Sequence, residues 1–207
     1  RYVIGMGARQ DRVKVLPLGV DTDVFRPDID ASKWMPRFGY KDTDKIIVFI
    51  GTLPRFSGLD RFIRLFPEIL KAVPEAKLLI IGAGEQQEEL QHLIDELHLR
   101  NEEKDDVIIT GYQPHERIPE FINLASVCIM PFEICGATRD IFPTKVIQYM
   151  ACGKPVVSIR LPGLVDTVRE NIHGIVYTDN WVEDIVRLLR SDCLAKQIGR
   201  AGLEYVK

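Results

Sequence analysis

Residues 45–50 limit the possible folds of this chain more than any other segment, because they include an unbroken apolar run that stops at Gly51. A short run that is apolar on both faces is typical of a strand in a parallel sheet, where helices cover both sides. Similar apolar runs, each near a glycine or proline, occur at residues 77–81, 107–109, 127–130, 155–158 and 174–177. The sequence therefore predicts a buried parallel sheet.

Segments with helical periodicity alternate with these strands. In residues 59–73 the apolar positions recur at spacings of three and four, and Pro74 follows. Further helices are expected at residues 85–97, 118–124, 143–152, 181–190 and 192–206. This alternation predicts an α/β fold, a Rossmann-like parallel sheet with helices on both faces. We expect residues 1–207 to form a single domain, with a short extra strand at 13–16 and a surface loop at 28–44.

Composition and charge exclude several classes of protein. The formal net charge of -3 argues against a nucleic-acid binder, which usually carries a basic excess. The cysteines and histidines lack the spacings of zinc ligands, so we expect no metal site. No apolar run approaches the ~18 residues that cross a bilayer. The chain opens at Arg1 rather than Met and stops at Lys207 within a helical pattern, so we expect a piece of a longer protein.

Small and polar residues follow the predicted strands, and ligands of open α/β sheets bind outside the carboxyl ends of the strands. The residues expected to border a ligand there are Gly51, Thr52, Gly82, Gly84, Gly111 and Tyr112. The helix near Pro143 would direct free N–H groups into the same crevice, which favours an anion such as a diphosphate. Lys145 and Arg55 would add full positive charges. Gly82-Ala83-Gly84 fits a tight strand-to-helix turn equally well, and it lacks the third glycine of a dinucleotide fingerprint.

The order of several motifs resembles that of the retaining GT-B glycosyltransferases of group 1. The matching segments are residues 13–27, 49–60, 78–84, 107–112 and 144–157. The resemblance implies that this chain is the C-terminal domain, which binds a nucleotide sugar, and that an N-terminal acceptor-binding domain is missing. Residues 51–60 and 143–145 are closest to the branch that transfers amino and deoxy sugars in bacterial surface polysaccharides.

The resemblance also implies roles for single residues. The family motif E-x7-E ends at Gln148, where relatives use a glutamate to hold the ribose hydroxyls. Its first acid is then Asp140, with Glu133 as the alternative, facing the donor sugar or its phosphate. Gln148 is a departure, since an uncharged amide forms weaker hydrogen bonds than a carboxylate. Lys145 and Arg55 are expected to act in catalysis by holding the diphosphate, and Pro143 and Thr144 are expected to border it.

The function that follows is transfer of a sugar from a nucleoside diphosphate sugar to an unknown acceptor, of the hexosyltransferase type, in polysaccharide or glycoconjugate synthesis. We expect a UDP-sugar ahead of a GDP-sugar, no cofactor and no metal, and no transfer by this fragment alone. The alternatives are a non-catalytic nucleotide-sugar-binding module and a GT-B-type sugar-nucleotide epimerase. The expected location is the cytoplasm or the inner face of the membrane, with peripheral membrane contact through the missing N-terminal domain.

Overall fold

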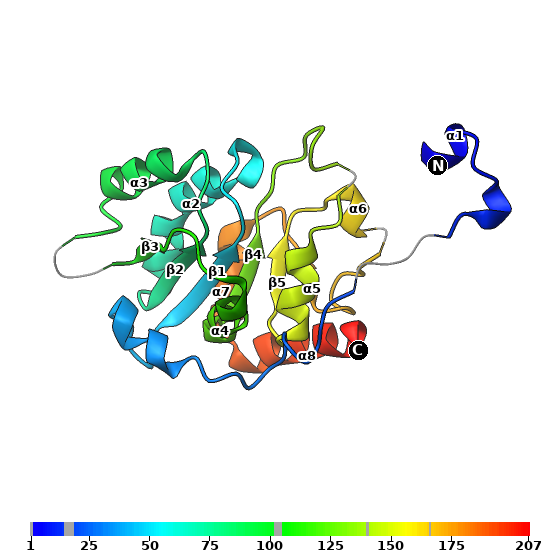
Figure 1. Ribbon diagram of the computed structural model, residues 1–207. Coiled ribbons are helices and arrows are strands. Elements are labelled where there is room, and N and C mark those ends of the chain that lie inside the picture. The colour runs from blue at the N-terminus through cyan, green and yellow to red at the C-terminus, as the bar shows by residue number, and fades with distance from the viewer. Residues whose placement is uncertain (1, 15–18, 102–104, 140, 166) are drawn as a thin grey trace.

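The computed structural model describes residues 2–14, 19–101, 105–139, 141–165 and 167–207, and it contains a six-stranded sheet within them (Figure 1). All neighbouring strands are parallel, in the order β3-β2-β1-β4-β5-β6. The strands are β1 (Lys45–Ile50), β2 (Ala76–Ile81), β3 (Val107–Ile109), β4 (Val127–Met130), β5 (Val156–Ser158) and β6 (Ile175–Tyr177). The predicted parallel sheet is confirmed, and most strand bounds agree with the prediction to within one residue.

Helices cover both faces of the sheet, as predicted. The helices of the described residues are α1 (Tyr2–Gly5), α2 (Leu59–Ala72), α3 (Gln87–Glu96), α4 (Ile118–Leu124), α5 (Thr144–Ala151), α6 (Pro162–Val165), α7 (Trp181–Arg190) and α8 (Asp192–Val206). In Figure 1, α4 and α5 lie in front of the sheet and α7 lies behind it. Alternate residues of β1 divide between the two cores: Val48 packs with α4 and α5, whereas Phe49 packs with α2, α3 and α7.

Residues 28–44 differ in part from the predicted surface loop. They contain two short 3-10 helices, Ser32–Trp34 and Pro36–Phe38, and the Trp34 side chain is buried. The Trp34 ring lies 4.6 Å from the ring of Phe121 on α4, and its indole N–H donates to Glu120 Oε2 at 2.6 Å. Most of the segment is exposed, as predicted for a surface loop, but Trp34 anchors it in the core. Half of the strand predicted at residues 13–16 lies outside the described residues, and Val13 and Lys14 are not in a strand.

The strand order determines where a ligand can bind. From β1 the chain first builds outward through β2 and β3, and then returns to place β4 on the other side of β1. Crevices in open α/β sheets form beside such a switch point, at the carboxyl ends of the strands. Among the described residues, no helix has the length and apolar character needed to cross a bilayer.

Candidate functional site

A cavity of about 280 Å³ lies at the carboxyl ends of β1, β2 and β3, with α5 forming one wall. Five of the expected site residues line it: Gly51, Thr52, Gly82, Tyr112 and Lys145. The structure therefore brings together expected residues from loops that are distant in the chain. Among the described residues, no group of three or more His, Cys, Asp or Glu side chains is arranged to hold a metal ion.

Lys145 is the cation of this cavity. It lies in the first turn of α5, whose N-cap residue Pro143 provides no side-chain cap. The ammonium is partly buried, and this burial lowers its pKa. Within the described part of the chain, Lys145 forms no ion pair. A partly desolvated cation beside free helix N–H groups favours an anion, because both the charge and the helix dipole have the same sign there.

Gln148 lies one turn further along α5, three residues after Lys145 and therefore on a neighbouring part of the same helix surface. Its Oε1 atom is buried and receives no hydrogen bond from any described residue. An acceptor left without a donor in this way costs about 1–3 kcal/mol. Gln148 does not border the cavity directly.

Arg55 does not line this cavity. Its Nε atom lies 2.9 Å from Glu85 Oε1, and its Nη2 atom lies 3.0 Å from Glu89 Oε1. Hydrogen bonds to Glu85 and then to Glu89 raise the pKa of the guanidinium, which stays largely exposed. The structure thus places Arg55 in a surface ion-pair cluster with residues at and near the start of α3, and not beside Lys145.

The two glycines of Gly82-Ala83-Gly84 have different surroundings. Gly82 borders the cavity, and a Cβ added to it would lie 1.8 Å from the carbonyl oxygen of Gly51. Gly84 does not border the cavity, and its added Cβ would lie 2.6 Å from the backbone nitrogen of Leu53. The loops after β1 and β2 therefore pack directly on each other. This close packing is the reason for Gly84, and it favours the tight-turn interpretation of the motif.

The remaining expected residues lie around the cavity or elsewhere. Glu133 pairs with Arg61 at 3.0 Å and borders a separate cavity of about 530 Å³ between the α2 and α7 starts. Pro143 and Thr144 begin α5 without lining the Lys145 cavity, and Gly111 lies next to its lining residue Tyr112 with a φ of 70°. Asp140 lies outside the described residues.

Sequence reasoning missed three cavity-lining residues that follow β3 in the chain, namely Gln113, His115 and Ile118. All three follow the Gly111-Tyr112 turn, so their position after a predicted strand was the available signal. The ring of His115 lies 5.6 Å from that of Phe25, edge to face. This contact connects the segment before the sheet to the rim of the cavity.

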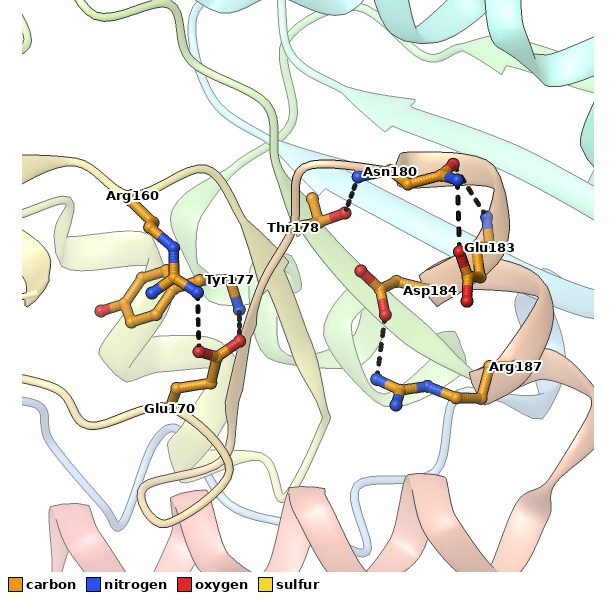
Figure 2. A network of polar contacts seen from close by, with 8 residues as sticks. All are labelled: Arg160, Glu170, Tyr177, Thr178, Asn180, Glu183, Asp184 and Arg187. Atoms are coloured by element: carbon orange, nitrogen blue, oxygen red, sulfur yellow. Dashed lines mark hydrogen bonds and ion pairs between the residues drawn. The ribbon is translucent and has the colours of Figure 1, made fainter.

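The loop between β5 and β6 is fixed by a polar network (Figure 2). Arg160 donates to Glu170 Oε2 at 2.8 Å, and the backbone N–H of Tyr177 donates to Glu170 Oε1 at 3.0 Å. Beyond β6, Asn180 caps α7 by accepting from the backbone N–H of Glu183. Arg160, like Arg55, is therefore satisfied by acidic partners, in contrast to Lys145.

The geometry of this fold agrees with comparisons to known proteins. A family model described as "Glycosyl transferases group 1" matches residues 30–204. The chain belongs to this family. It is 34% identical over 197 residues to a GDP-mannose-dependent alpha-(1-6)-phosphatidylinositol monomannoside mannosyltransferase of Mycolicibacterium smegmatis, covering 92% of this chain and 50% of the relative. The chain thus spans about half the length of that relative.

Two solved structures share the fold. Anabaena Alr3699/HepE in complex with UDP and glucose superposes with a TM-score of 0.76 at 19% identity, covering 98% of this chain and 54% of that one. The C-terminal domain of a glycosyl transferase group 1 family protein (LpcC) from Francisella tularensis gives 0.73 at 17% identity, covering 91% and 96%. The predicted fold, a Rossmann-like C-terminal domain of the GT-B type, is confirmed.

Proposed function

We propose that this chain is the donor-binding domain of a retaining glycosyltransferase, which transfers a sugar from a nucleoside diphosphate sugar to an acceptor. The observation that carries the proposal is Lys145, a partly buried cation that faces the cavity with no ion-pair partner in the described residues. The unpaired Oε1 of Gln148 supports it, because a ribose hydroxyl could donate to this oxygen. Membership of the group 1 family supports the reaction class.

In this proposal the diphosphate is the leaving group. Negative charge grows on it as the bond to the sugar breaks, and groups aimed in advance at that charge lower the barrier. Lys145 and the free N–H groups at the start of α5 are such groups. Because the chain spans half of its Mycolicibacterium relative, we propose that the acceptor is held by a part of the protein outside these residues.

We propose two donor bases for the first tests. The Mycolicibacterium relative is named as GDP-mannose-dependent, which favours guanine, whereas the Anabaena structure holds UDP. The sequence alone led us to expect UDP first, so both nucleotides belong in one titration series. We also propose that the reaction takes place in the cytoplasm, where nucleotide sugars are made.

Calorimetric titration of the chain with UDP, GDP and ADP, with and without magnesium, tests the proposal. We expect metal-independent binding that Lys145→Ala weakens about tenfold or more, since a hydrogen bond to a charged group contributes about 1.5–3 kcal/mol. Lys71→Ala is the matched control, because Lys71 is exposed in the last turn of α2. A folded chain that binds none of these nucleotides would sink the proposal.

A further inference from the structure

We propose that the cavity between the starts of α2 and α7 binds a neutral sugar ring of a glycan, at a site separate from the Lys145 cavity. This inference goes beyond the donor-binding function and does not depend on it. The sugar ring would lie against an aromatic side chain of α7 and form hydrogen bonds with an Arg–Glu pair of α2 and the segment after β4.

The two cavities lie on different faces of the sheet. Lys145 is on α5, which lies in front of the sheet in Figure 1, whereas α7 lies behind it. The second cavity is lined by the first two turns of α2, the first residue of α7 and residues 131–134 after β4. Its volume of about 530 Å³ is within the range of about 300–1,000 Å³ that small-molecule sites occupy. The two cavities share no lining residue among those described, so a ligand in one leaves the other free.

An aromatic side chain forms part of the wall. Trp181 is the first residue of α7, and its ring lies 5.4 Å from the buried ring of Phe62, edge to face. Asn180, drawn in Figure 2, caps α7 by accepting from the backbone N–H of Glu183, which fixes the backbone beside Trp181. Trp181 is partly exposed, and its indole N–H has no acceptor among the described residues. Such a side chain offers an apolar surface for the C–H groups of a sugar and an N–H donor for a hydroxyl.

An ion pair forms the polar part of the wall. Arg61 Nε lies 3.0 Å from Glu133 Oε1. The backbone of Glu133 is held at both ends, because its N–H donates to the Phe56 carbonyl at 2.9 Å and its carbonyl accepts from the Thr138 hydroxyl. Within the part of the chain that the structure describes, the two charged side chains pair only with each other. A guanidinium has five N–H donors and a carboxylate two acceptor oxygens, so donors and acceptors remain for neighbouring sugar hydroxyls.

The charge of the lining favours a neutral ligand. Arg61 and Glu133 are the charged side chains among the described lining residues, and their charges cancel. A phosphate would compete with Glu133 for Arg61, whereas a neutral hydroxyl can bind either partner without breaking the pair. A purely apolar ligand would remove water from the pair and offer no hydrogen bond in return. A sugar ring has apolar C–H faces and a rim of hydroxyls, and it therefore fits both parts of the wall.

The test uses the two tryptophans of the chain as separate reporters in ¹H–¹⁵N spectra. Trp181 lines the cavity, whereas the indole N–H of Trp34 donates to Glu120 elsewhere in the fold. The probes are the methyl glycosides of mannose, glucose and N-acetylglucosamine. At least one of them should shift the Trp181 indole signal until it saturates and leave the Trp34 signal in place. The shift should persist in the presence of UDP, and inorganic phosphate should not produce it.

Glu133→Gln keeps the size of the side chain and removes its charge, so we expect the affinity for the glycoside to fall about tenfold. Glu68→Gln, at an exposed position on α2, is the matched control and should leave this affinity unchanged. Trp181→Leu should abolish saturation transfer from the protein to the sugar, with an unchanged Trp34 signal showing that the chain is folded. The inference is overturned if no glycoside shifts the Trp181 signal, if the two glutamate variants lose affinity equally, or if UDP abolishes the shift or phosphate reproduces it.

Discussion

The phenol oxygen of Tyr149 lies 2.9 Å from the backbone nitrogen of Ile50, and this buried hydrogen bond joins α5 to the last residue of β1. Tyr149 is fully buried, so no water can replace its hydroxyl. Lys145 precedes Tyr149 by four residues, about one helical turn. The contact therefore fixes the position of the cavity's cation relative to the wall formed by Ile50 and Gly51.

Tyr149→Phe should lower the free energy of unfolding by about 1–3 kcal/mol, because it leaves the buried N–H of Ile50 without an acceptor. Urea unfolding at equilibrium measures this, with an unchanged m-value showing that the unfolded state is not altered. Tyr205→Phe is the control: its hydroxyl donates to the Thr167 carbonyl at 3.1 Å in an exposed position, so the loss should be small. Equal losses in the two variants would contradict the assigned importance of the Tyr149 contact.

Gln148→Glu should raise the affinity for UDP or GDP about fivefold. A carboxylate accepts a stronger hydrogen bond from a ribose hydroxyl than an amide oxygen does, by roughly 1 kcal/mol. Without ligand the same substitution should lower the Tm, because a buried charge without a partner is costly. Calorimetry with the 2′,3′-dideoxy nucleotides supplies the control, since these cannot gain from the change. An equal gain for the dideoxy forms would argue against ribose contact.

Arg55→Ala should change nucleotide affinity less than about twofold, although the sequence motif predicts that Arg55 holds the diphosphate. In the structure Arg55 is paired with Glu85 and Glu89, and exposed ion pairs of this kind contribute about 0–1 kcal/mol to stability. The measurement is the titration used for Lys145→Ala. An equally large loss of affinity would mean that Arg55 leaves its acidic partners for the ligand, as the motif predicts.

His173 should make the stability of the fold depend on pH. Its Nδ1 accepts from the backbone N–H of Arg169 at 3.0 Å, and its ring stacks on Tyr205 with centroids 4.1 Å apart. Burial, followed by the charge of Arg169, lowers the pKa of His173 below its ordinary 6.5. The unfolded chain then binds a proton more readily than the folded chain. The stabilisation is complete above the unfolded pKa and is lost as the pH falls through the lowered folded value.

The check is the free energy of unfolding in urea between about pH 5 and pH 8, where histidine titrates. His173→Asn should flatten the rise of stability with pH, whereas His92→Asn, at an exposed position on α3, should leave it intact. A slope that is the same in wild type and His173→Asn would show that other groups carry the pH dependence.

The sequence by itself determined the elements and the class of fold. β1, β3 and β4 have the bounds that their apolar runs predicted, and α4 has the bounds that its helical pattern predicted. This works because burial on both faces of a strand and periodicity along a helix are properties of short segments. The ordered motifs also identified the family before the fold was known, and they singled out Lys145, which lines the cavity.

Only the tertiary structure decided which of the expected residues share one cavity. Arg55 and Lys145 are both cations beside glycine-rich turns, but Glu85 and Glu89 reach Arg55 from another element. Gly84 follows a strand like Gly82, yet it serves the contact with Leu53. Gln113 lines the cavity, although no sequence motif predicted it there. The physical reason is common to these cases. Each depends on contacts between loops that are far apart in the chain, and the amino-acid pattern of a short segment does not specify such contacts.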